Sequence, residues 1–73
     1  MDGFEHQLKT LVKYAQERAC SGAFAMYRPD FLTVACFDDS GALQIIADTK
    51  NEGDKFRTFS QLYAQINSFK RHD

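Results

Sequence analysis

The sequence predicts a small α+β domain with two layers, in which helices at both ends of the chain flank a strand-rich middle. Three observations predict this class: apolar residues recur with a helical period at both ends, β-branched and aromatic residues dominate the middle, and turn residues separate the apolar runs. A chain of 73 residues has room for one domain, spanning residues 1–73. The expected order is α-β-β-β-(β)-α, with an antiparallel sheet and both helices on one of its faces.

The first helix is predicted over residues 3–20. Its apolar residues recur every three or four positions, as one face of an α-helix requires: Phe4, Leu8, Leu11, Val12, Ala15 and Ala19. Glu5 and Lys9 stand four residues apart, a spacing at which opposite charges stabilise a helix.

Three strands are predicted at residues 23–27, 31–37 and 42–48. Arg28-Pro29-Asp30 forms a turn between the first two, and Asp38-Asp39-Ser40-Gly41 forms a hairpin turn between the second and third. Residues 55–57 are a candidate for a short fourth strand. The second helix follows Thr58, which forms a capping box with Gln61, and its apolar face carries Phe59, Leu62, Tyr63, Ile66 and Phe69.

The predicted sheet carries apolar residues on both faces. A sheet with one face in water alternates apolar and polar residues, and this one does not. We expect Leu32, Val34, Cys36, Leu43 and Ile45 to face the helices, which leaves Phe31, Phe37, Ile46 and Tyr27 outside. Such a patch often marks an interface. Loops or chain ends that cover this face, or a β-bulge that changes the faces, are the alternatives.

The charged residues do not indicate a strongly basic protein. The net charge is −1 with both signs interspersed, whereas most nucleic-acid-binding proteins show a basic face. The alternative of a nucleic-acid-binding accessory protein would use Lys9, Lys13, Arg18, Arg57 and Arg71.

Residue types that carry chemistry are sparse. His6 and His72 lie near opposite ends of the chain, Cys20 and Cys36 have no zinc-ligand spacing, and no glycine-rich phosphate loop exists. We therefore expect no catalytic residue, no metal and no cofactor. The sequence has neither a signal peptide nor an apolar run of membrane-spanning length. We expect a cytoplasmic protein with both cysteines as thiols.

The segment from Tyr27 to Phe69 resembles short accessory proteins of bacterial plasmids and phages. The similarity lies in two strands followed by Lys55-Phe56-Arg57-Thr58-Phe59, which leads directly into an amphipathic helix. The resemblance implies a bacterial mobile-element setting and transfers no functional residue. Taken with the apolar sheet face, the expected function is a non-enzymatic protein–protein interaction module that forms a homodimer through the sheet face or a sheet edge and acts as a regulator or adaptor by docking on another protein.

Overall fold

The chain folds into two helices and three strands in the predicted order. The computed structural model describes residues 2–28, 31–49 and 58–69. These form α1 (Asp2–Arg18), β1 (Phe24–Arg28), β2 (Phe31–Phe37), β3 (Leu43–Asp48) and α2 (Phe59–Ser68). The α+β class and the α-β-β-β-α order are confirmed. The candidate fourth strand at 55–57 lies outside the described residues.

The sheet is an antiparallel meander in the order β1-β2-β3. Phe24 pairs with Ala35 across β1 and β2, and Phe37 pairs with Leu43 across β2 and β3. The register shifts by one residue in β3, because Val34 pairs with Ala47 while its neighbour Ala35 pairs with Ile45. Ile46 is the extra residue of a β-bulge.

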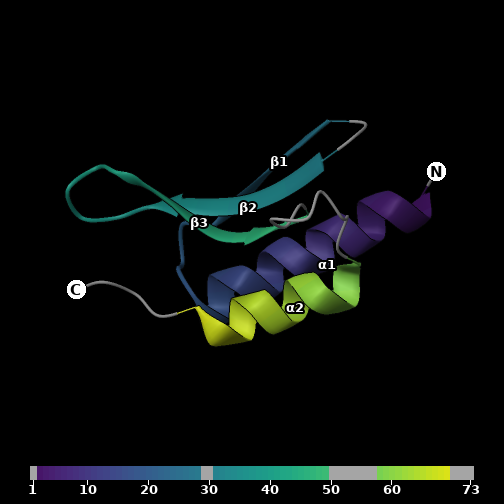
Figure 1. The fold of residues 1–73 in the computed structure, drawn as a ribbon. Coiled ribbons are helices and arrows are strands. Elements are labelled where there is room, and N and C mark those ends of the chain that lie inside the picture. Colours follow the sequence, from purple (N-terminus) through teal and green to yellow (C-terminus); the bar gives the residue numbers. More distant parts are fainter. Residues whose placement is uncertain (1, 29–30, 50–57, 70–73) are drawn as a thin grey trace.

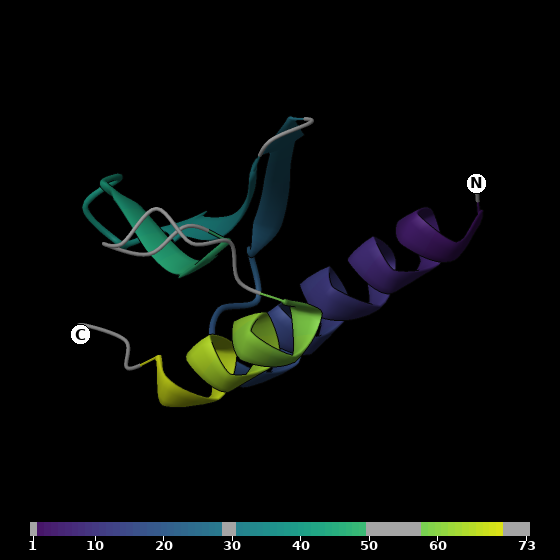
Figure 2. The same ribbon diagram turned by 45° about the vertical axis from the view of Figure 1, so that its right-hand side comes forward.

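Both helices lie on the same side of the sheet, as predicted, and they run parallel to each other (Figures 1 and 2). Edge-to-face ring contacts join them at the start and in the middle of α2: Phe4 with Phe59 at a centroid distance of 6.2 Å, and Tyr14 with Tyr63 at 4.9 Å. The Tyr14 hydroxyl also donates to the Asn67 side-chain oxygen at 2.7 Å. α2 contacts β3 as well as α1, so it joins the two layers.

The core lies between the helices and the inner face of the sheet, the face turned toward them. Leu11 of α1, Val34 of β2, and Leu62 and Ile66 of α2 are its largest fully buried side chains. Leu32 and Cys36 belong to the same cluster, so the predicted inner side of β2 is confirmed.

The first helix ends two residues earlier than predicted. Beyond Arg18 the Cys20 amide donates to the Ala15 carbonyl, a 6→1 bond of the kind that closes helix C-termini, and the Ala23 amide then donates to the Cys20 carbonyl in a turn. The Gln16 side chain donates to the Ala23 carbonyl at 3.0 Å and holds the start of β1 against the helix. Neither α1 nor α2 is long and apolar enough to cross a membrane, and the described residues contain no other helix.

Candidate functional site

The outer face of the sheet, the face turned away from both helices, carries a contiguous group of exposed apolar side chains. Strand pairing places Phe24 and Met26 of β1, Phe37 of β2, and Leu43 and Ile45 of β3 on this face. We call these five residues the apolar patch. Figure 2 shows that both helices lie on the opposite side of the sheet.

Four members of the patch are about half exposed. The exposed fractions are 40% for Met26, 58% for Phe37, 48% for Leu43 and 49% for Ile45. The fifth, Phe24, is half-buried because its ring lies 5.7 Å from the ring of Phe37. Ala35 pairs with Phe24 on one side and with Ile45 on the other, so it lies between them on the outer face. It is fully buried but is not part of the core cluster on the inner face.

The predicted composition of the outer face is only partly right. Phe37 lies there and is exposed, and Phe31 lies there half-buried. The prediction for Ile46 is wrong: its side chain is only 5% exposed, because the bulge turns both Ile46 and Ala47 into the core. Tyr27 is 55% exposed but pairs with Leu32 on the helix side, where its ring meets Phe4 at 5.6 Å.

The sequence interpretation missed four of the five patch residues: Phe24, Met26, Leu43 and Ile45. Leu43 and Ile45 were expected to face the helices, and the structure places them outside. The signal that could have found them is the length of the β2–β3 connection. With Asp38 and Ala42 joined by a backbone hydrogen bond, Phe37 stands opposite Leu43, and paired residues share a face.

Three basic residues of the nucleic-acid alternative are described by the structure, and none of them lies on the outer face. Lys9, Lys13 and Arg18 are exposed on α1, in the other layer of the molecule, and the Arg18 guanidinium lies 5.1 Å from the Tyr14 ring centroid. Glu5 and Glu17 are exposed on the same helix. Arg57 and Arg71 lie outside the described residues.

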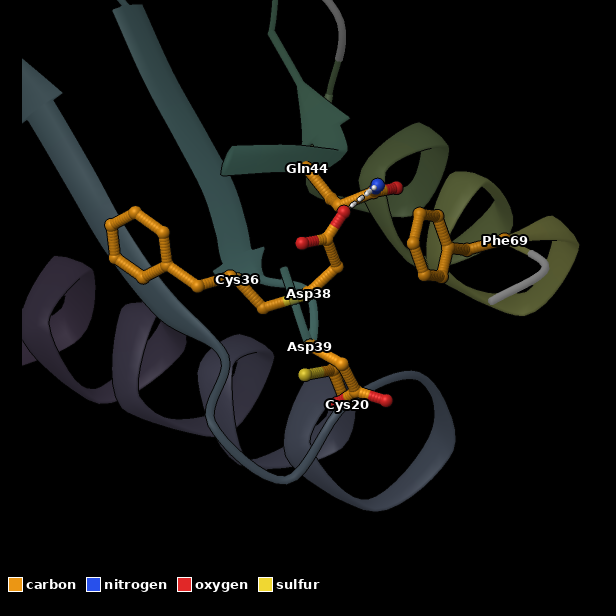
Figure 3. A pocket seen from close by; sticks show the side chains of 7 residues that line it. Cys20, Cys36, Asp38, Asp39, Gln44 and Phe69 are labelled. Atoms are coloured by element: carbon orange, nitrogen blue, oxygen red, sulfur yellow. Dashed lines mark hydrogen bonds between the residues drawn. The ribbon is translucent and has the colours of Figure 1, made fainter. Parts of the chain in front are cut away.

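A small pocket lies where the C-terminal ends of α1, β2 and α2 meet (Figure 3). Its volume of about 20 Å³ is the space of a single water molecule, and seven residues line it: Cys20, Cys36, Phe37, Asp38, Asp39, Gln44 and Phe69. Both cysteines are thiols in this structure. No histidine is among the described residues that line the pocket, so they offer no imidazole base for a thiol.

Asp38 has a structural role at the edge of this pocket. The Ser40 hydroxyl, the Ala42 amide and the Gln44 side chain donate to its carboxylate, and they lower its pKa from 3.8 to about 2. A carboxylate that is ionised at all ordinary pH values and saturated with donors is a poor general acid or base. Among the described residues, no group of three His, Cys, Asp or Glu side chains is arranged to hold a metal ion.

Comparison of the chain with protein-family models, with curated proteins and with solved structures finds no match.

Proposed function

We propose that this protein is a non-enzymatic interaction module that pairs with a second copy of itself through the apolar patch. The observation that carries the proposal is that four half-exposed large apolar side chains gather on one sheet face. The largest contiguous apolar patch on a protein surface is often an interaction site. Within the same proposal the protein acts as a regulator or adaptor, in the bacterial mobile-element setting that the resemblance of residues 27–69 implies.

The apolar core of the domain is small, so further burial in a dimer would stabilise the fold. Of the twelve buried apolar side chains among the described residues, five are alanine, which contribute little apolar area. Domains of this size bury only about 60% of the surface of the unfolded chain, and many depend on a partner subunit for further burial. Pairing through the patch would bury Phe37, Leu43 and Ile45 at no cost to the existing core.

A second copy suits the patch because none of its five members is charged. In a two-fold dimer the same surface meets itself, so a charge close to the symmetry axis would meet its own copy. An uncharged patch avoids that repulsion and leaves no unpaired charge buried at the centre of the interface.

The size of the face predicts a weak dimer. The seven residues of β2 and the three strands give the face a footprint of roughly 23 Å by 14 Å, or about 300 Å². A standard interface takes about 800 Å² from each partner. We therefore expect a dissociation constant in the micromolar range or above, which a dilution series from about 10 μM to 1 mM would cover.

Sedimentation equilibrium of the wild type, Phe37→Asp and Tyr27→Asp tests the proposal. Tyr27 is the matched control, because it is as exposed as Phe37 but lies on the helix side. We expect a concentration-dependent dimer for the wild type and for Tyr27→Asp, and a monomer for Phe37→Asp with unchanged circular dichroism. A wild type that stays monomeric throughout, or a Phe37→Asp variant that pairs as well as the wild type, would refute the proposal.

A further inference from the structure

The two cysteines of the chain border the same small pocket, although they come from different layers of the molecule. Cys20 follows the end of α1, and Cys36 lies near the end of β2. Both are among the residues that line the water-sized pocket. Figure 3 shows that Cys20 enters this pocket from the end of α1 and Cys36 from β2. The fold therefore gathers both thiols of the chain at one place.

The backbone around the pocket explains why the two cysteines are neighbours. The Ala23 amide donates to the Cys20 carbonyl at 3.0 Å, so Cys20 lies one turn before Ala23. The next residue, Phe24, pairs with Ala35 across β1 and β2. Continued by one residue, this register brings Ala23 beside Cys36. Cys20 is thus a single turn away from the residue that lies beside Cys36.

Both side chains also lie on the inner side of the sheet. Cys36 belongs to the core cluster there and is 3% exposed. Cys20 packs against the same cluster but is only half-buried, so solvent reaches it. The pocket that both side chains border has the space of about one water molecule, so a sulfur atom that rotates into it displaces no packed side chain.

We propose that Cys20 and Cys36 form a reversible disulfide when the protein meets a small disulfide oxidant such as glutathione disulfide. The Cys20 thiolate attacks first, because Cys20 is the more exposed: it bonds to one glutathione sulfur, the glutathione disulfide breaks, and one glutathione thiolate leaves. The Cys36 thiolate then attacks the Cys20 sulfur and releases the second glutathione. Two protein thiols are oxidised, one glutathione disulfide is reduced to two glutathione thiols, and the two protons pass through solvent to the leaving thiolates.

The disulfide would act as a redox-sensitive link between the two layers. It joins the end of α1 directly to β2, which are otherwise connected along the chain through β1. A cross-link of this kind restricts the unfolded chain, so the oxidised protein should melt at a higher temperature than the reduced protein. The inference is independent of the proposed dimer, because neither cysteine belongs to the apolar patch.

Oxidation equilibria in mixtures of reduced and oxidised glutathione test the inference. After acid quenching and alkylation of the remaining thiols, mass spectrometry separates the internal disulfide from glutathione adducts and from linked dimers. We expect the internal disulfide, with an equilibrium constant at least about tenfold larger in native buffer than in concentrated urea, because the fold holds the two thiols together. A smaller ratio, or oxidation that yields only adducts or linked dimers, would overturn the inference.

The double variant Cys20→Ser, Ser21→Cys is the matched control. It exchanges two neighbouring side chains and keeps the composition of the chain, but position 21 is exposed and is not among the described residues that line the pocket. In urea the variant should form the disulfide as readily as the wild type, and in native buffer the gain of about tenfold should be absent. Circular dichroism confirms that the variant folds. An equal gain in this variant would show that proximity along the chain is sufficient, and it would also overturn the inference.

Discussion

At the scale of single residues, Asp38 organises the connection that sets the register of the hairpin. One of its carboxylate oxygens accepts from the Ser40 amide and the Ala42 amide, both at 2.9 Å, and from the Ser40 hydroxyl at 2.6 Å. The other accepts from the Gln44 side chain at 3.0 Å. Gly41 completes the loop with a positive φ of 89°, which glycine adopts without strain. The register that places Leu43 and Ile45 on the outer face follows from this loop.

Asp38→Asn should make the protein less stable at neutral pH and less sensitive to acid. The pKa of Asp38 falls from 3.8 to about 2 on folding, so its ionised form stabilises the folded state above pH 3.8. This stabilisation disappears as the pH falls through about 2, because the protonated form loses its charge-assisted hydrogen bonds. Between these pH values the wild type should lose more stability than the variant.

Urea unfolding followed by circular dichroism at several pH values measures this difference. Asp39→Asn is the matched control, because it removes the same charge from the next residue, which is exposed. Identical pH profiles for Asp38→Asn and the wild type would show that the hydrogen bonds to Asp38 contribute nothing to stability.

At the scale of elements, both helices agree closely with the prediction from the sequence, whereas the predicted facing of β3 does not. Helix periodicity and the Thr58–Gln61 capping box depend on residues within a few positions, so local reasoning predicted α2 from its first residue. The facing of β3 depends on its pairing with β2, which alternation along one strand does not reveal. The bulge at Ile46 then shifts the alternation once more, so that Ile46 and Ala47 both enter the core.

Thr58→Ala should destabilise the protein by about 1 kcal/mol, because it removes the N-cap acceptor of α2. The Thr58 hydroxyl accepts from the Gln61 amide at 3.3 Å, and the Gln61 side chain accepts from the Thr58 amide at 2.8 Å. Ser60→Ala is the control, since Ser60 is exposed within the same helical turn and forms no part of the cap. Urea unfolding should separate the two variants, and equal stabilities would argue against a role for the capping box.

At the scale of the whole molecule, the sequence predicted the class, the order of the elements and the helical layer. It also predicted an apolar second face, on which Phe31 and Phe37 were correctly placed. The membership of that face could not be derived from periodicity, because it depends on how three strands align. For this reason Leu43 and Ile45, which were predicted to face the helices, lie on the outer face, and Ile46, which was predicted to lie outside, is buried.

Dimerisation also predicts a concentration-dependent stability. A dimer that dissociates on unfolding becomes more resistant to heat as protein concentration rises, because association favours the folded state by mass action. The melting temperature of the wild type should therefore rise between about 10 μM and 1 mM, and that of Phe37→Asp should not. Differential scanning calorimetry over this range measures both, and a constant melting temperature for the wild type would contradict the proposed pairing.

The bulge in β3 also bears on how the length of this strand can change in evolution. In a regular strand, losing one residue exchanges the two faces for every position beyond the gap. Deletion of Ile46 would instead convert the bulge into regular pairing, with Ile45 still outside and Ala47 still inside, and only one core side chain would be lost. Deletion of Gln44, two residues earlier, would exchange the faces of the strand. A homologue with a shorter β3 is therefore expected to lack the residue at position 46 and to retain the same outer face.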